Sequence, residues 1–313
     1  MRIRILGSAA GGRFPQWNCG CANCVAVRGN SAENHSAFKA RTQAQLALSA
    51  DGSSWFLAGA SPDLASQIEA CPNLHPRALR HSPIAGVVLA SCDLDHVLGL
   101  LLLRELQPLR VYAAPSILRI LREENSMFGM LNRVEPQVVW TDVSSEAPFP
   151  LLSANGTDSG LRCEVHYLSG RYPKYVKTEA AKLGGGEASA ALFFESSSDK
   201  LGVGKRVAYI PAVGSLSESL LEKIDGADLL LFDGTFWSDD ELQRVQGSGE
   251  TAHQMGHIPV EESLRLLKDI KVGRKMFIHL NNTNPILDEA SPERKAVRAA
   301  GWEVAEDNWQ LEL

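Results

Sequence analysis

The chain has 313 residues, of which 44% are hydrophobic and 22% charged, and these proportions are those of an ordinary globular protein. The formal net charge of −6 gives no basic field for phosphate backbones or anionic lipids, so we expect no nucleic-acid binding. The longest apolar run, residues 98–103, is too short to span a bilayer, and the first residues lack an apolar signal segment. We therefore expect a cytoplasmic protein without a membrane span.

Runs of apolar and β-branched residues predict strands along most of the chain, at residues 3–6, 43–48, 55–57, 86–90, 111–113, 161–167, 190–195, 207–210, 229–232 and 275–278. Helical spacing and start signals predict helices between them, at residues 61–70, 98–106, from Pro115, at 216–224 and at 259–267. Residues 144–160 are rich in turn formers. This alternation favours two sheets between helices, and we expect one domain covering residues 1–313.

Three of the six cysteines form one cluster, Cys19-x-Cys21-x-x-Cys24. Three thiolates at this spacing are typical of a zinc site, whereas disulfides are improbable in a reducing compartment. The cluster lies in a long loop, about residues 11–36, which we expect to lack secondary structure and to be held by the ion.

Asp95 and His96 directly follow the predicted strand at 86–90 and precede a helix. Adjacent residues in such a turn can converge on one ion, and a carboxylate with an imidazole suits zinc, iron or manganese. The alternative is that Asp95 only caps the helix and that His96 is an ordinary, partly buried polar residue.

Two later strands also end in polar residues, since Asp233 follows 229–232 and His279 follows 275–278. Strand ends that carry Asp or His can line one edge of a sheet, where sites of layered α/β proteins usually lie. For Asp233, the alternative is a turn-forming aspartate before Gly234.

The ordered pattern Ser91-x-Asp93-x-Asp95-His96 with Gly99, then Asp233, then His279, resembles the metallo-β-lactamase superfamily, whose motif is His-x-His-x-Asp-His. The resemblance implies an α/β (α+β) αββα sandwich, with two mixed β-sheets flanked by helices. It also implies that the active-site ion is bound by Asp95, His96, His279 and Asp233.

The first ion site of two-metal members of the superfamily looks dismantled in this chain. Ser91 and Asp93 stand at the two positions of His-x-His, and the middle of the chain offers no obvious ligand beyond His166. This departure disfavours a two-metal phosphodiesterase or lactamase, which needs two catalytic ions.

Two further features resemble the phosphodiesterase-like and ribonuclease Z-like branches. The structural zinc of the former takes a fourth ligand three residues after the late histidine, which is Asn282 here, so either its oxygen or another group or water completes the site. His257 matches a histidine that the latter keep outside the metal shell, which implies proton transfer or substrate orientation. The alternative for His257 is that it only precedes a helix begun by Pro259.

Four segments together resemble the protein B family of coenzyme PQQ (pyrroloquinoline quinone) biosynthesis: residues 7–12, 14–19, 91–96 and 279–285. The resemblance implies an iron-dependent hydroxylase that inserts oxygen into the tyrosine ring of a cross-linked Glu-Tyr precursor. It implies Fe²⁺ as the catalytic ion, with Zn²⁺ or Mn²⁺ as alternatives in the isolated protein, and a structural Zn²⁺. The expected partners are dioxygen and a small-molecule or peptide-derived PQQ precursor, with a homodimer left open.

Under this hypothesis Asp93 and Asp233 either bind the ion or orient one of its ligands, and Asp93 is also a candidate base for a phenolic proton. Arg171, Tyr175 and Lys177 are expected to contact substrate carboxylates. A different class of function is also attached to the family, namely a carrier that moves PQQ or its precursor toward the periplasm. Turnover of dioxygen distinguishes the enzyme from the carrier.

Overall fold

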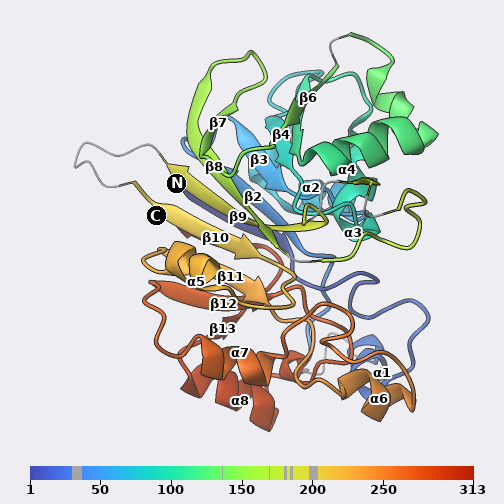
Figure 1. The fold of residues 1–313 in the computed structure, drawn as a ribbon, viewed down its shortest axis with the longest axis vertical. Coiled ribbons are helices and arrows are strands. Elements are labelled where there is room, and N and C mark those ends of the chain that lie inside the picture. Colours follow the sequence, from blue (N-terminus) through green and yellow to red (C-terminus); the bar gives the residue numbers. More distant parts are fainter. Residues whose placement is uncertain (30–36, 136, 169, 180–181, 184–185, 197–203) are drawn as a thin grey trace. The chain divides into compact units, whose positions relative to one another are not determined.

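The computed structural model describes residues 1–29, 37–135, 137–168, 170–179, 182–183, 186–196 and 204–313 (Figure 1). The chain forms two compact units: unit 1 contains residues 1–6, 45–207 and 308–313, and unit 2 contains residues 7–44 and 208–307. The single domain expected from the sequence stays a prediction. Residues 30–36 of the predicted cysteine loop lie outside the described residues.

The strands are β1 (Arg2–Gly7), β2 (Gln45–Ser49), β3 (Trp55–Ala58), β4 (Ile84–Val88), β5 (Leu109–Ala113), β6 (Val138–Asp142), β7 (Phe149–Leu152), β8 (Asp158–Leu168), β9 (Ser189–Ser196), β10 (Arg206–Ile210), β11 (Leu229–Asp233), β12 (Arg274–Ile278), β13 (Glu303–Val304) and β14 (Trp309–Glu312). The α-helices are α1 (Ala22–Arg28), α2 (Leu64–Ala70), α3 (Leu94–Val97), α4 (Pro115–Arg119), α5 (Glu218–Ile224), α6 (Glu241–Gln246), α7 (Val260–Leu266) and α8 (Pro292–Ala299). Shorter 3₁₀ segments are η1 (Pro72–Leu74), η2 (Leu98–Leu103), η4 (Ser126–Asn132) and η6 (Pro285–Leu287), and η3 (Ile120–Glu124) is a π-helical turn.

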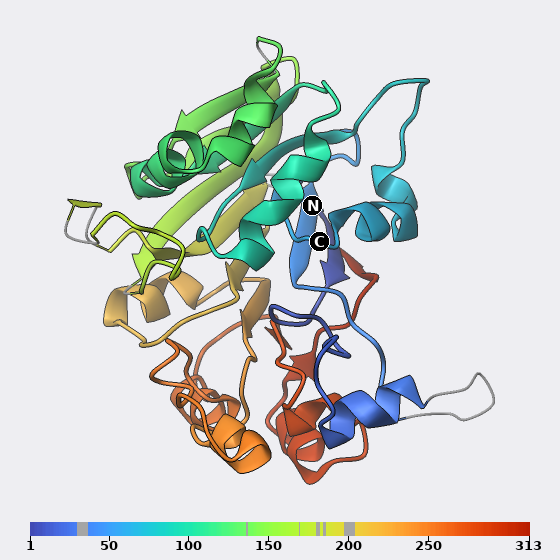
Figure 2. The same cartoon turned by 90° about the vertical axis from the view of Figure 1, so that its right-hand side faces the viewer.

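Unit 1 contains a mixed sheet with the strand order β14-β1-β2-β3-β4-β5-β6. Strands β3 to β6 run parallel, whereas β1 pairs antiparallel with β14 and β2 antiparallel with β3. The pairing of β1 with β14 brings the two chain ends together, as Figure 2 shows, and the amino group of Met1 donates to the carbonyl of Leu313 at 2.9 Å. Unit 1 also contains the antiparallel strands β7, β8 and β9.

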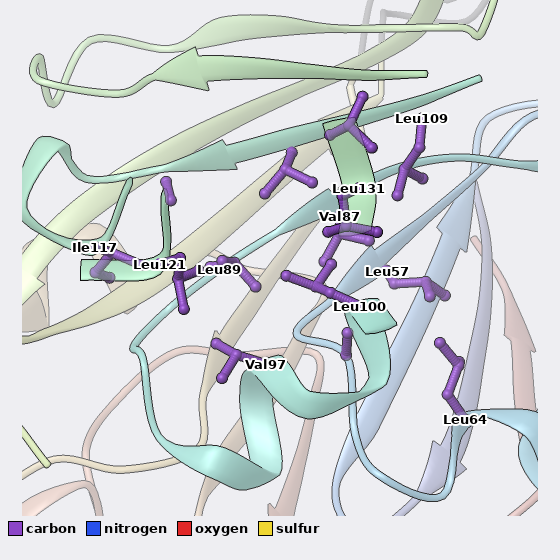
Figure 3. Packing of buried hydrophobic residues seen from close by; sticks show 14 of the residues in the cluster. Leu57, Leu64, Val87, Leu89, Val97, Leu100, Leu109, Ile117, Leu121 and Leu131 are labelled. Carbon is purple, nitrogen blue, oxygen red and sulfur yellow. The ribbon is translucent and has the colours of Figure 1, made fainter. Parts of the chain in front are cut away.

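The core of unit 1 packs between its parallel strands and the helices that connect them. Leu57, Val87 and Leu109 from neighbouring strands lie with Leu64 and Leu100 from helical segments in one buried cluster (Figure 3). Every residue of β4 is buried, and a continuous apolar strand is what a parallel sheet covered on both faces requires.

Unit 2 contains the strands β10, β11, β12 and β13, of which β11, β12 and β13 are parallel. The indole of Trp302 stacks on the ring of Phe277 at a centroid distance of 4.3 Å and meets Phe232 edge-on. Ser217 and Ser291 cap α5 and α8 by accepting hydrogen bonds from backbone N–H groups. In this part of the chain, drawn in orange and red in Figures 1 and 2, strands and helices alternate.

Most long apolar runs form the elements that the sequence predicts, and the differences have local causes. The helix predicted at 98–106 is a 3₁₀ segment that ends at Leu103 and follows the short α3. Residues 144–160, predicted as turns, contain β7 and the start of β8, and β6 was not predicted because most of its residues are only partly buried or exposed. The cysteine loop contains α1, so it does not lack secondary structure. Among the described residues, no helix is both long and apolar enough to cross a membrane.

Gly99 allows the segment that carries Asp95 and His96 to approach the loop after β3. Ala60 donates its N–H to the carbonyl of His96 at 2.7 Å, and Gly99 donates its N–H to the carbonyl of Ala60 at 2.8 Å. A Cβ on Gly99 would lie 2.2 Å from the carbonyl oxygen of Ser61, which is backbone and cannot move alone.

We therefore expect Gly99→Ala to lower the free energy of unfolding by about 1–3 kcal/mol, the usual cost of forcing atoms into a packed site. Urea unfolding of the two proteins measures this difference. Gly129→Ala is the matched control, because a Cβ on Gly129 meets no atom within 4 Å. Equal losses in the two variants would contradict the close approach.

Candidate metal centres

The Asp95–His96 pair lies in the first turn of α3, directly after the buried strand β4. Asp93 is the N-cap residue of α3, so Asp95 does not cap the helix. A carboxylate oxygen of Asp95 lies 4.0 Å from Nε2 of His96, and the side chains are 15% and 7% exposed. The carboxylate and the imidazole therefore sit close together at the end of a strand, as the sequence predicts.

Ser91 connects Asp93 to His96. Its hydroxyl donates to Oδ2 of Asp93 at 2.9 Å, lies 3.0 Å from Nδ1 of His96 and accepts from the N–H of Asp93 at 3.2 Å. The sequence identified Ser91 only as a missing ligand, whereas the structure gives it three hydrogen-bond partners. Nδ1 of His96 is thereby engaged, and a metal-binding role of this ring falls to Nε2.

In unit 2, Asp233 ends β11 and is fully buried. Oδ1 accepts from the N–H and the hydroxyl of Thr235, and Oδ2 accepts from the N–H of Val213 at 3.0 Å and from the imidazole of His257 at 2.8 Å. Burial opposes the charge of Asp233, but His257, His279 and Thr235 together outweigh it and keep the pKa of this carboxyl below its usual value. Asp233 is thus a charged group whose hydrogen bonds stay inside unit 2.

His279 follows β12, whose parallel register places Ile278 opposite Asp233. Its Nδ1 lies 2.9 Å from the hydroxyl of Thr235, and its ring stacks on that of His257 at a centroid distance of 5.8 Å. The backbone of His279 has φ = 62°, a conformation that non-glycine residues adopt rarely and that recurs at functional sites. Asp233, His257 and His279 offer ligand atoms that all lie within 4.8 Å of one another.

Gly234, directly after β11, packs closely against the end of β12. A Cβ on Gly234 would lie 2.8 Å from the Cβ of Phe277 and from Leu280, so only glycine allows β11 and β12 to end this close together. The turn that alternatively explains Asp233 is present, because the N–H of Thr235 donates to Oδ1 of Asp233. The role of Asp233 as a metal ligand stays a prediction.

The three cysteines of the predicted zinc site converge in unit 2. Their sulfur atoms lie within 4.8 Å of one another, and the side-chain amide of Asn282 contacts all three, at 3.1 Å from Cys19, 3.6 Å from Cys21 and 3.4 Å from Cys24. Burial raises the pKa of Cys24 to about 11. Three soft ligands around one polar group fit the donor set of a structural zinc ion.

The remaining predicted residues are not members of these clusters. His166, on β8, lies 3.5 Å from a carboxylate oxygen of Glu146. The hydroxyl of Tyr175 donates to the carbonyl of Cys92, so this side chain is anchored beside the Asp95–His96 turn. Arg171 and Lys177 are both exposed.

Glu241 is a buried acid of unit 2 that the sequence did not single out. It starts α6, accepts from the N–H of Trp237 at 2.6 Å and accepts from the hydroxyl of Thr283, in the loop after His279. Burial raises its pKa to about 7, and the two hydrogen bonds only partly offset this effect. No local sequence signal marks the residue, because its burial depends on the distant loop.

Comparisons with known proteins place these features in a family. A model of the beta-lactamase superfamily domain matches residues 54–280. Coenzyme PQQ synthesis protein B of Rhodopseudomonas palustris is 41% identical over 318 residues, and the alignment covers 100% of both chains. The protein of the same name from Methylorubrum populi is also 41% identical, over 320 residues with the same coverage.

Solved structures agree with this result. The Zn²⁺-bound PqqB from Methylobacterium extorquens matches with a TM-score of 0.88 and 39% identity, and 100% of each chain is covered. A diphosphatase from the PhnP family matches with a TM-score of 0.67 over 100% of this chain and 98% of that one, but at 19% identity it shares only the fold.

The raised pKa of Glu241 makes the stability of the protein depend on pH. Between pH 4.5, the usual pKa of the side chain, and about pH 7, the folded state retains a proton that the unfolded state has released. The free energy of unfolding therefore falls as the pH rises through this window. The shift corresponds to roughly 3 kcal/mol.

We expect Glu241→Gln, which is neutral throughout, to gain stability relative to the wild type as the pH rises from 4.5 to 7, after which the difference levels off. Urea unfolding at a series of pH values measures it. Glu218→Gln, at an exposed position of α5, should show no such growth. A pH-independent difference for Glu241→Gln would show that the carboxyl is not perturbed.

Proposed function

This chain belongs to the coenzyme PQQ synthesis protein B family and has the metallo-β-lactamase fold, with two mixed β-sheets flanked by helices, and we propose that it is a metal-dependent oxygenase of PQQ biosynthesis. The proposed reaction inserts oxygen into the tyrosine ring of a cross-linked Glu-Tyr precursor. One atom of dioxygen enters the ring and the other leaves as water, with two electrons from an external reductant. The proposed reactive ion is Fe²⁺.

The observation that carries this proposal is the hydrogen bonding of two imidazoles through Nδ1. Nδ1 of His96 and Nδ1 of His279 each lie within 3.0 Å of a hydroxyl that itself donates to a carboxylate. Both rings therefore have Nε2 as the nitrogen suited to a metal. With the carboxylate of Asp95, they make the two-histidine, one-carboxylate set of non-haem iron oxygenases. We propose that these three residues bind one ion.

In such a ligand set the ion supplies open positions for dioxygen and substrate. The residues of the chain supply orientation and proton transfer. His257 donates from Nδ1 to Asp233, so its Nε2 is the atom proposed to accept the phenolic proton. Asp93 is exposed and is a second proposed proton acceptor, toward solvent. The cations Arg171 and Lys177 are proposed to attract the carboxylates of the precursor.

We propose separately that Cys19, Cys21 and Cys24 bind a structural Zn²⁺. The amide oxygen and nitrogen of asparagine are interchangeable by rotation about one bond, so the oxygen of Asn282 can occupy the position beside the three sulfurs. The support for zinc is the thiolate donor set and the Zn²⁺-bound state of PqqB from Methylobacterium extorquens.

A full-length protein reconstituted with Fe²⁺ under anaerobic conditions tests the proposed activity. With ascorbate and a synthetic cross-linked Glu-Tyr compound, we expect dioxygen consumption and a product heavier by one oxygen atom, which becomes labelled under ¹⁸O₂. His279→Ala should lower turnover by about 100-fold or more, because the proposed ion loses one of its three ligands.

The same experiment separates the other candidate functions. Stoichiometric binding of the compound without dioxygen uptake would contradict the oxygenase function and support the carrier function. Activity that requires two catalytic ions per chain besides the structural zinc would contradict the oxygenase function and support a two-metal hydrolase. Circular dichroism of His279→Ala confirms that any loss of turnover is not a loss of fold.

Cys21→Ser tests the structural zinc. Loss of one thiolate should release the tightly bound zinc and lower the stability of unit 2, because the ion holds the loop by folding energy. Elemental analysis measures the metal, and thermal unfolding measures the stability. Cys71→Ser, at a buried cysteine of unit 1, is the control and should retain zinc. Full zinc content in Cys21→Ser would contradict the assignment.

A further inference from the structure

Two hydroxyl groups occupy the same chemical position beside two different histidines. In unit 1, Ser91 lies between a carboxylate of Asp93 and Nδ1 of His96. In unit 2, Thr235 lies between a carboxylate of Asp233 and Nδ1 of His279. In both, the hydroxyl residue and the aspartate are two positions apart in the sequence, in opposite order.

The hydrogen-bond count of Ser91 decides the direction of each bond. A hydroxyl has one proton and two acceptor lone pairs. The proton goes to the carboxylate of Asp93, which only accepts, and one lone pair takes the N–H of Asp93 at 3.2 Å. The second lone pair faces Nδ1 of His96 at 3.0 Å, so this nitrogen must carry a proton and donate.

Thr235 imposes the same direction on His279. Its hydroxyl donates to Oδ1 of Asp233 at 2.7 Å, and that oxygen also accepts the N–H of Thr235 at 3.0 Å. The hydroxyl therefore has only lone pairs left for Nδ1 of His279 at 2.9 Å. As in unit 1, the imidazole must donate from Nδ1, which in the neutral ring leaves the lone pair on Nε2.

The carboxylate of Asp233 is fully used by these contacts. It accepts four hydrogen bonds, two on each oxygen, and an ionised carboxylate has about four lone-pair sites. One of the four comes from His257, so a single buried charge fixes the tautomers of two stacked imidazoles. These bonds favour a supporting role over the direct ligation that the sequence motif suggested for Asp233, and that ligation stays a prediction.

Both hydroxyls are held by hydrogen bonds within their own turn, which do not involve the histidines. The N–H of Asp93 bonds back to Ser91, and the N–H of Thr235 bonds back to Asp233, which are the two-residue side-chain turns that Ser and Asp readily form. The aspartate and the hydroxyl thus form a rigid pair. The imidazole then docks against it, five residues on for His96 and 44 residues on for His279.

We propose that Ser91 and Thr235 are positioning residues, which transmit the negative charge of Asp93 and Asp233 to Nδ1 of His96 and His279 and hold both rings with Nε2 ready to bind a metal. The relevance of these rings to an ion rests on the proposed function, but their tautomers do not. In two-metal members of the superfamily, the positions of Ser91 and Asp93 hold the His-x-His ligands of the first ion. On this proposal, Ser91 and Asp93 instead support His96, a proposed ligand of the remaining ion.

The tautomers can be read directly by long-range ¹H–¹⁵N NMR of the full-length protein at pH 8, with Zn²⁺ supplied only in the amount that fills the cysteine site. We expect His96 and His279 to be protonated on Nδ1 in the wild type. Ser91→Ala should release His96 alone and Thr235→Val should release His279 alone, giving a mixture of tautomers. The conservative variants Ser91→Thr and Thr235→Ser should restore the wild-type signals, and Ser66→Ala and Thr251→Val are hydroxyl controls elsewhere in each unit.

Metal affinity provides the second readout. We expect Ser91→Ala and Thr235→Val each to weaken Co²⁺ binding about 10–100-fold in competition with a chelator, the usual effect of removing a partner of a ligating histidine, and the conservative variants to recover most of it. Nε2-protonated rings in the wild type, or unchanged tautomers in both variants, would overturn the proposal. An intact tautomer pattern in a protein that consumes no dioxygen would refute the proposed function and leave the positioning intact.

Discussion

The proton count of a hydroxyl group is the constraint on which the site depends. Wherever a hydroxyl gives its one proton to a carboxylate, any imidazole on its other side must be the donor. The structure applies this constraint at Ser91 and at Thr235, through contacts of 2.7 to 3.0 Å. Each histidine is then presented by its neighbours in one chemical form. On the proposal made above, the protein itself thereby orients both rings for an ion before any ion binds.

The fold makes these contacts possible by ending strands beside each other. Parallel register brings the ends of β11 and β12 together. Because Gly234 has no Cβ, the chain that follows β12 can pack directly against it. The left-handed backbone of His279 then turns the chain into the loop that carries Asn282. Since the amide of Asn282 contacts the three cysteine sulfurs, the loop that begins at His279 also reaches the proposed zinc site. An ion held by the cysteines would therefore stiffen the loop that begins with a proposed catalytic ligand.

The sequence was most informative where one property repeated along a segment. Continuous apolar runs predicted β4, β11 and β12, and polar residues at their ends predicted Asp95, Asp233 and His279 as site residues. Elements without such a run were not predicted. Most residues of β6 are half-buried or exposed, β13 has only two residues, and α1 lies in the segment that the cysteine cluster marked as a loop. Burial of Glu241 and the contact of Thr235 with His279 depend on residues more than 40 positions away. No window of sequence reports such distant contacts, and the role of Ser91 likewise became visible only once its three hydrogen bonds were seen.

The central claim, that Asp95, His96 and His279 bind one reactive ion, can be tested most directly by diffraction from anaerobic crystals of the full chain grown with Fe²⁺. The account predicts an anomalous peak at the iron edge, about 2.1 Å from Nε2 of both histidines and bonded to the carboxylate of Asp95. Iron bound through Nδ1 of either ring, or iron that leaves any of the three side chains uncoordinated, would contradict it.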